Sequence, residues 1–412
     1  MATGVKDEDA SFELEPISNE RNRPSSHRPN RSSFSSTSDN SFDDSAEQRG
    51  LDSSVLYTVE EERAIFKKLD QLLVLFIALL DMLSFLARSI VTITLAIVLS
   101  DAKKRAKTAL YGPVVYSNFA DPCVIEVDKK YYAFATNSIV AGGGIHIQLA
   151  TSDDFNNWTL TAKDALPFVG EWSAGVKIWA PSVVQLDDAS FVMYYAARSN
   201  ASGPFTQCIG AATSETIEGP YTPLPSPIVC PLSQGGAIDP DGFRDVDGSR
   251  YIVYKIDGNN LNNRTGPLHP TPLMLQQVDS KDGVTLIGEP LQLLDRDDTD
   301  GPLIEGPSLM RVAGSGKTEE VYILFYSSNS YTTSHYDVAY AASTTGIKGP
   351  YTRAATPLLS TGDDGGKLYG PGAIDVLEGS MKVVFNADLD SNWMVRQMWT
   401  GQVAVNGTTV RI

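Results

Sequence analysis

Three acidic residues of this chain stand at similar, turn-like points. Asp121 and Asp239 each directly precede a proline, and Glu305 lies two residues before one in the stretch GPLIEGPSLM. A carboxyl group held rigidly at a strand end and partly out of water stays protonated near neutral pH, so Glu305 is a candidate proton donor. Two carboxyl groups facing each other across a pocket can cleave a glycosidic bond, one as acid and one as base or nucleophile.

A sequence pattern that recurs five times could bring these residues together in the fold. Each copy has a small residue or Asp before a proline, a short apolar strand, an acidic or glycine turn and an aromatic-rich strand, as in ADPCVIEVDKKYYAFAT. The prolines are Pro122, Pro181, Pro240, Pro307 and Pro371, with spacings of 59, 59, 67 and 64 residues. Repeats of this length made only of strands are typical of propeller blades.

The repeats predict an all-β fold for residues 111–412, a five-bladed β-propeller in which the first strand of each blade lines a central channel. The residues just before the prolines then point at one mouth. They are Asp121, Ala180, Asp239, Gly306 with Glu305 beside it, and Gly370. Opposed blades suit a carboxyl separation of roughly 6.5–9.5 Å, which leaves room for a water and gives inversion. A third carboxylate near the acid helps to keep the acid protonated.

Residues 111–412 resemble glycoside hydrolase family 43, the five-bladed arabinanases, α-L-arabinofuranosidases and β-xylosidases. The matching stretches, in the family's order, are NFADPCVI, IWAPSVVQ, AIDPDGFRDVDGSRYIVYK and IEGPSLM. The resemblance implies an inverting hydrolase of arabinofuranosyl or xylosyl linkages in plant cell-wall polysaccharide. It makes Asp121 the general base that activates water, Glu305 the general acid, and Asp239 the residue that tunes and orients the acid.

Three further residues are candidates for contacting the sugar. The resemblance places Trp179, in IWAPS, in the pocket wall or a stacking surface, although a core position suits it equally well. His335 follows the acid-bearing blade and either reaches the mouth or lies in an exposed loop. Arg396 lies where the family often has an arginine that reaches the sugar, while an arginine on a final strand is more often part of a surface ion pair.

No cofactor or metal is predicted. The chain has four histidines and three cysteines and contains no CxxC or HExxH motif. Many family members carry Gly-Pro-Gly-His in the fifth blade, where the histidine helps to hold a central ion or water cluster. Ala373 stands in its place here, and alanine ligates nothing, so a calcium-type ion at that point is in doubt.

The first 107 residues have a different character. Residues 1–56 are rich in Ser, Asn, Asp and Arg and poor in apolar side chains, which predicts a disordered tail. Residues 57–107 hold a hydrophobic segment, of which 72–99 is long and apolar enough for one membrane pass. Residues 57–90 resemble the first membrane helix of fungal major facilitator transporters of the anion:cation symporter type, through the run EEERAIFKKLD and the end LSFLARS. No second such helix follows, which excludes a transporter.

Two interpretations of this segment remain open. It is a membrane or signal anchor, or the working product begins at Met82, where MLSFLARSIVTITLAIVLSDA has the features of a cleavable secretion signal and the chain is a fused gene product. Either interpretation predicts a catalytic domain in the lumen or outside the cell, anchored or secreted. Four glycosylation sequons fit this route. They begin at Asn157, Asn200, Asn263 and Asn406.

The three cysteines allow two arrangements. Cys208 and Cys230 are candidates for a disulfide in an oxidising compartment, which would leave Cys123 as a buried thiol. Three free core cysteines suit the sequence equally well.

Composition and motif details limit the partners. A formal net charge of −17 argues against nucleic acid, whose phosphates require basic patches. The expected partners are a polysaccharide or oligosaccharide and, if 72–99 is retained, a membrane. Two alternatives are a non-catalytic carbohydrate-binding propeller, which would be expected to lose an acid, and an inactive fusion product. The sister invertase group uses Asn-Asp-Pro, Arg-Asp-Pro and Glu-Cys, whereas this chain has Ala-Asp-Pro, Ile-Asp-Pro and Glu-Gly, which disfavours fructans.

Overall fold

The computed structural model contains two bodies, a long N-terminal helix and a β-domain. It describes residues 58–105, 110–138, 144–201, 203, 205–314, 319–390 and 395–412. The predicted disordered tail, residues 1–56, lies outside the described residues.

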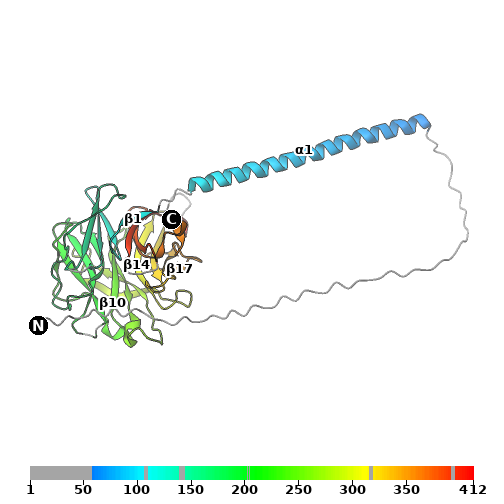
Figure 1. Cartoon of the computed structure of the whole chain (residues 1–412). Coiled ribbons are helices and arrows are strands. Elements are labelled where there is room, and N and C mark those ends of the chain that lie inside the picture. Colours follow the sequence, from blue (N-terminus) through cyan, green and yellow to red (C-terminus); the bar gives the residue numbers. More distant parts are fainter. Residues whose placement is uncertain are drawn as a thin grey trace, which may run out of the picture. The chain divides into compact units, whose positions relative to one another are not determined.

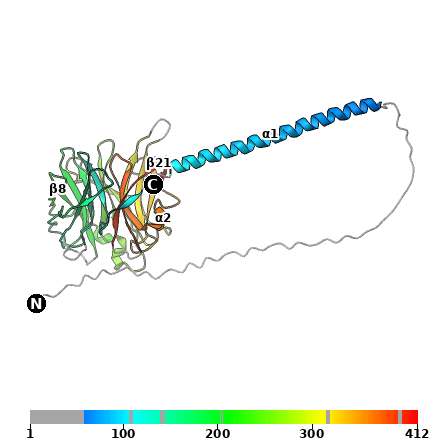
Figure 2. The same ribbon diagram turned by 45° about the horizontal axis from the view of Figure 1, so that its top comes forward.

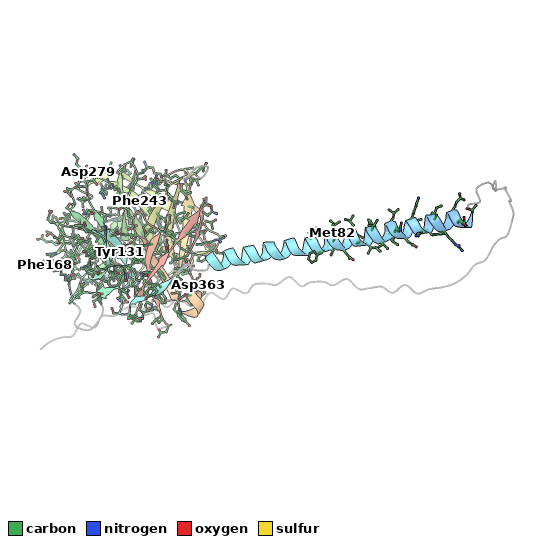
Figure 3. The ribbon with its side chains drawn as sticks, turned by 90° about the horizontal axis from the view of Figure 1, so that it is seen from above. Met82, Tyr131, Phe168, Phe243, Asp279 and Asp363 are labelled. Carbon is green, nitrogen blue, oxygen red and sulfur yellow. A yellow bond between two sulfur atoms is a disulfide. The ribbon has the colours of Figure 1, made fainter. Side chains whose placement is uncertain are left out.

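The N-terminal body is one helix, α1 (Val59–Arg105), of 47 residues (Figure 1). A capping box starts it, because the Thr58 amide donates to Glu61 Oε2 at 2.9 Å and Thr58 Oγ1 accepts from the Glu61 amide at 3.3 Å. The window Arg63–Leu86 has a mean hydropathy of 2.1 and is long and apolar enough to cross a membrane. Its apolar side chains are exposed along the helix (Figure 3, where Met82 is labelled).

The β-domain is a five-bladed propeller of four-stranded antiparallel sheets, which confirms the predicted fold (Figures 1 and 2). Blade 1 comprises β2 (Cys123–Val127), β3 (Lys130–Ala135), β4 (Gln148–Ser152) and β5 (Thr159–Leu160). Blade 2 comprises β6 (Trp179–Gln185), β7 (Phe191–Arg198), β8 (Gln207–Ser214) and β9 (Thr222–Pro223). Blade 3 comprises β10 (Ala237–Arg244), β11 (Arg250–Ile256), β12 (Leu273–Val278) and β13 (Leu286–Leu294). Blade 4 comprises β14 (Ile304–Val312), β15 (Val321–Ser328), β16 (Asp337–Ser343) and β17 (Thr352–Arg353).

Blade 5 closes the ring with strands from both ends of the domain. Its strands are β18 (Tyr369–Val376), β19 (Lys382–Asp388), β20 (Gln397–Gln402) and, outermost, β1 (Tyr111–Val115). The innermost strands β2, β6, β10, β14 and β18 each contact the next around a complete circle. The remaining elements are η1 (Leu232–Gln234), η2 (Gly258–Asn262), α2 (Asp363–Gly366) and the hairpin of β21 (Ala404–Asn406) and β22 (Thr409–Arg411).

The hydrophobic core lies between neighbouring blades rather than on the axis. Phe134 and Met193 pack in the cluster between blades 1 and 2, and Phe325, Phe385 and Trp399 pack between blades 4 and 5. These side chains are fully or almost fully buried. Because the apolar side chains point to the faces of each sheet, the inner edge of each blade is left for polar groups.

Each blade has a residue with left-handed backbone at the same place, within its innermost strand or, in blade 1, just before it. These residues are Asp121 (φ 51°), Ala180 (44°), Asp239 (55°), Gly306 (57°) and Ala373 (49°). Register shifts mark the place in blades 2 to 5. The predicted member in blade 5, Gly370, was therefore wrong by three residues. Ile374 stands there instead of a proline, and the true spacings are 59, 59, 67 and 67 residues.

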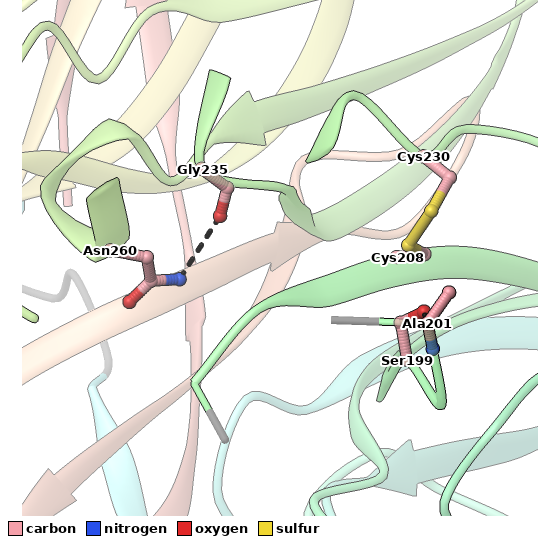
Figure 4. Close-up of a disulfide and its surroundings, with 6 residues drawn as sticks. All are labelled: Ser199, Ala201, Cys208, Cys230, Gly235 and Asn260. Carbon is pink, nitrogen blue, oxygen red and sulfur yellow. Dashed lines mark hydrogen bonds between the residues drawn. A yellow bond between two sulfur atoms is a disulfide. The ribbon is translucent and has the colours of Figure 1, made fainter. Parts of the chain in front are cut away.

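One disulfide joins blade 2 to the segment that leads into blade 3. Cys208 on β8 is bonded to Cys230, close to the point where the Asn260 amide donates to the Gly235 carbonyl at 3.2 Å (Figure 4). Cys123 is a buried free thiol. Of the two arrangements that the sequence left open, the structure has the disulfide.

Candidate active site

Asp121 stands at the axial end of blade 1 with both carboxylate oxygens held. Thr136 Oγ1 donates to Oδ2 at 2.7 Å, and Arg396 Nη1 donates to Oδ1 at 2.8 Å. The Asp121 side chain is 19% exposed, so solvent reaches it. The left-handed backbone of Asp121 is a strained conformation for a residue with a side chain, and its amide is held by Asn386 Oδ1 at 2.8 Å. The carboxylate is therefore fixed in place and still accessible.

Glu305 on β14 is also held through both oxygens. Lys255 Nζ donates to Oε2 at 3.1 Å, and the Tyr336 hydroxyl donates to Oε1 at 2.9 Å. The Glu305 side chain is 15% exposed, whereas that of Lys255 is 2% exposed. Burial acts to lower the pKa of Lys255, but Asp257, Glu305 and Asp239 raise it overall, so the ammonium stays charged.

Asp239 on β10 interacts electrostatically with both other carboxylates. Its Oδ2 accepts a hydrogen bond from the Gly306 amide at 3.0 Å. Burial, followed by the nearby charge of Glu305 and then of Asp121, raises the pKa of Asp239 to about 8, although Lys255 opposes the shift. Asp239 is therefore protonated at neutral pH, and the carboxyl groups of blades 1, 3 and 4 meet at one end of the axis.

Tyr336 reaches Glu305 across a glycine. A Cβ atom on Gly372 would lie 2.0 Å from Cε1 of the Tyr336 ring, so only glycine fits under this ring. Burial, then Glu305 and Asp121, hold the pKa of Tyr336 well above its usual value. The phenol therefore keeps its proton and donates a hydrogen bond to Glu305.

Residues 111–392 match the family described as glycosyl hydrolases family 43. The chain belongs to this family.

Curated relatives match over shorter stretches. An "Extracellular endo-alpha-(1->5)-L-arabinanase" of Thermotoga petrophila is 31% identical over 165 residues, which cover 32% of this chain and 33% of the relative. A "Putative beta-xylosidase" of Escherichia coli is 30% identical over 210 residues, 49% of this chain and 36% of the relative. The chain thus spans about a third of the length of these relatives.

Solved structures match over most of the propeller. A thermostable family-43 glycoside hydrolase superposes with a TM-score of 0.61 at 23% identity, covering 74% of this chain and 95% of that one. An endo-1,4-beta-xylanase from Bacteroides thetaiotaomicron gives a TM-score of 0.56 at 28% identity, with 72% and 94% covered. The first of these likenesses concerns the fold alone.

The three predicted sugar-contacting residues of this family 43 chain lie in different settings. Arg396 is largely buried, pairs with Asp121 and stacks under the exposed Tyr331 ring at 4.7 Å. Trp179, half-buried at the start of β6, has Lys177 Nζ 5.5 Å from its ring centre. His335 is exposed in the β15–β16 connection, directly before Tyr336. Arg396 is therefore part of the carboxylate cluster. His335 stands beside Tyr336, which donates to Glu305, whereas Trp179 precedes Ala180, whose amide donates to Thr136.

Sequence reasoning missed Lys255, Tyr336 and Thr136, which hold the carboxylates. Lys255 has the one available signal, since it is a charged residue inside the apolar strand RYIVYKI, where an unpaired charge would be costly. Tyr336 sits in a connection whose path the sequence does not reveal. Thr136 is one of many threonines at strand ends.

The environment of Ala373 does not fit the ion that some family 43 enzymes hold. Its side chain is a methyl group, and its amide donates to Ser327 Oγ at 2.8 Å. The buried Nδ2 of Asn386 is a donor without a hydrogen-bond partner, and a donor faces an oxygen acceptor rather than a cation. Within the described part of the chain, no group of three or more His, Cys, Asp or Glu side chains could hold a metal.

Proposed function

We propose that the propeller is an inverting glycoside hydrolase that cleaves arabinofuranosyl or xylosyl linkages in plant cell-wall polysaccharide. The observation that carries the proposal is the meeting of Asp121, Asp239 and Glu305, from three different blades, at one end of the axis. Family membership and the arabinanase and xylosidase relatives support the sugar class.

Each carboxyl group has a setting that suits one role. Asp121, fixed by Thr136 and Arg396 and partly exposed, accepts a proton from the attacking water as the water forms a bond to the anomeric carbon. Glu305 gives a proton to the departing glycosidic oxygen. Asp239 orients the acid through the Gly306 amide and holds the proton that the neighbouring carboxyl groups share, because two adjacent carboxylates resist being charged together.

Arg396, Trp179 and His335 are the proposed sugar contacts. Arg396 orients Asp121 through Nη1, and its other side-chain N–H groups are donors whose hydrogen bonds sugar hydroxyls could accept. Trp179 offers a ring edge beside Ala180, and His335 would act from the exposed β15–β16 connection. No metal and no cofactor take part in this proposal.

The location of the domain is a second part of the proposal. Residues 57–107 would anchor the propeller, residues 111–412, on the lumenal or outer side of a membrane, or be removed as a signal beginning at Met82. The apolar window of α1 and the Cys208–Cys230 disulfide support an oxidising compartment. Mapping transcript starts, upstream of Met1 or near Met82, separates an anchored protein from a secreted one and from an inactive fusion.

Hydrolysis itself is tested on the full-length protein with debranched arabinan, arabinoxylan and aryl glycosides. Products are identified by chromatography, and the first-formed anomer is followed by NMR before mutarotation. The proposal expects release of arabinose- or xylose-containing products with inverted configuration. Retention would contradict the assignment of Asp121 as base, and binding without turnover would favour the non-catalytic carbohydrate-binding propeller.

A further inference from the structure

Lys255 occupies a position that recurs in every blade. It lies on the second strand, opposite the residue that precedes the left-handed one. The residues at this position are Thr136, Ala196, Lys255, Ser327 and Asn386. In three blades the side-chain oxygen accepts a hydrogen bond from the left-handed amide of the next blade. These bonds run from Ala180 to Thr136 (3.0 Å), from Ala373 to Ser327 (2.8 Å) and from Asp121 to Asn386 (2.8 Å).

A lysine cannot make this bond, because an ammonium group has no acceptor. The left-handed amide of the next blade, that of Gly306, donates instead to Asp239 Oδ2 at 3.0 Å. The Lys255 ammonium lies 3.1 Å from Glu305 Oε2 and 3.2 Å from Asp257 Oδ1. Blade 3 thus accepts this bond through Asp239 rather than through its second strand, and it gains a buried cation beside the proposed acid.

The charges around Lys255 leave one carboxyl group without a cation. Asp121 pairs with Arg396, and Asp257 pairs with both Lys255 and Arg264, the latter at 3.4 Å. Glu305 pairs with Lys255. Within the described residues Asp239 has no ion pair, and the hydrogen bond that it accepts comes from an uncharged amide, that of Gly306. Four carboxyl groups therefore face three cations, and one proton on Asp239 balances the charge, in keeping with its raised pKa of about 8.

We propose that Lys255 is a positioning residue that keeps Glu305 ionised in the resting enzyme, while the proton shared by the two carboxyl groups lies on Asp239. When the Lys255 ammonium turns wholly to Asp257, Glu305 is free to accept that proton. The proposal rests on the hydrolase function proposed above. Both oxygens of Glu305 accept hydrogen bonds, from Lys255 and Tyr336, which is the arrangement of a carboxylate rather than of a carboxylic acid. Asp257, 4% exposed, is already within reach as the second resting place of the ammonium.

The proton balance of the cycle is closed. A proton moves from an Asp239 oxygen to a Glu305 oxygen once Lys255 has turned away. Glu305 passes it to the glycosidic oxygen as the bond to the anomeric carbon breaks, and the attacking water gives its proton to Asp121. Asp121 releases that proton to solvent, and Asp239 takes one up, which restores the resting state.

Two substitutions should move the pH profile in opposite directions. The groups facing Glu305 are Lys255, Tyr336 and Asp239, with Arg396 and Asp121 further away. Lys255→Met removes the cation, so Glu305 is protonated more easily and the fall of kcat/KM at high pH moves up by about one pH unit. Asp257→Asn leaves Lys255 to Glu305, so the fall moves to lower pH.

Lys382→Met is the matched control, because its ammonium lies 4.3 Å from the centre of the Tyr131 ring in another part of the propeller and should leave the profile unchanged. Profiles of both test variants that coincide with wild type, or that move in the same direction, would overturn the proposal. If Lys255→Met does not fold, Asp257→Asn decides alone, and an unchanged or upward profile overturns the proposal.

Infrared difference spectroscopy tests the proton's place without any substrate. Compared with wild type at neutral pH, Asp239→Asn should lack one carboxylic-acid carbonyl band, while the bands of other buried carboxyl groups such as Asp375 remain, and identical carbonyl bands in the two proteins would overturn the proposal. Absence of hydrolysis by wild type on every substrate would remove the hydrolase function, while the infrared result would still report where the proton lies.

Discussion

The end of the axis that holds Asp121, Asp239 and Glu305, here called the rim, and the layer beneath it are built from the same five strands. The two regions use acidic residues in opposite ways. At the rim, Asp121, Asp239 and Glu305 contact cations, amides and solvent. Two residues deeper, an axial layer points at the centre of the channel, with one residue from each blade. Its members are Cys123, Ser182, Asp241, Ser308 and Asp375.

The two carboxyl groups of the axial layer are bound by neutral groups. Ser182 Oγ donates to Asp241 at 2.9 Å, Ser308 Oγ to Asp375 at 3.1 Å, and the Val124 amide to Asp375 at 2.7 Å. Burial raises the pKa of Asp241 to about 6 and that of Asp375 well above its usual value. Raised pKa values occur in both regions. The neighbouring groups, not the size of a shift, separate the two layers: cations lie among the rim carboxyl groups, whereas serine hydroxyls and an amide bind those of the axial layer.

The largest effect should come from Asp121→Asn. The substitution keeps the hydrogen bond from Thr136 but removes the group that accepts the water's proton, so kcat should fall by about 10²–10⁴-fold on every substrate. Thermal unfolding should stay near that of wild type, since the side chain is partly exposed. Turnover close to wild type would show that the rim is structural, like the axial layer.

Asp239→Asn and Asp241→Asn make the same change two residues apart on β10 and should differ in activity. Asp239→Asn should lower kcat by about 10²-fold, because the asparagine holds no transferable proton. Asp241→Asn should leave kcat near that of wild type. Equal losses of kcat in the two variants would remove the distinction between rim and axial layer.

Gly372→Ala should lower activity without changing any charged residue. Its Cβ displaces the Tyr336 ring and breaks the hydrogen bond to Glu305, so kcat should fall by about 10²-fold while KM changes less. Gly144→Ala is the control, because nothing lies within 4 Å of the added carbon. Wild-type turnover in Gly372→Ala would show that Tyr336 does not support Glu305.

The smallest effect concerns the pH dependence of stability in the axial layer. The folded-state pKa of Asp241, about 6, is raised above its unfolded value, so its favourable contribution is complete below pH 4 and is lost as pH rises through 6. Asp241→Asn lacks this titration. Chemical denaturation at pH 4 and pH 7 should show a smaller loss of unfolding free energy in the variant, by about 1–3 kcal/mol. An equal loss in both proteins would contradict the shift.

The repeat made the fold predictable, and deviations from the repeat set the limit. Five copies of one sequence pattern predicted five blades and placed Asp121 and Asp239 at equivalent backbone positions. In blade 5, Gly370 precedes a true proline, whereas the equivalent Ala373 precedes Ile374, so the proline alone misled the alignment. Lys255 and Tyr336 were out of reach, because their roles depend on contacts between blades that no local pattern encodes.

The most direct test of the account is the leaving-group dependence of Glu305→Gln. A poor leaving group needs the proton of Glu305, whereas a dinitrophenyl group departs without one. The account predicts a kcat loss of about 10³-fold on arabino- or xylo-oligosaccharides and a loss below about tenfold on the dinitrophenyl glycoside. Equal losses on the two substrates would contradict the role of Glu305 as the acid and, with it, the interpretation of the rim as an active site.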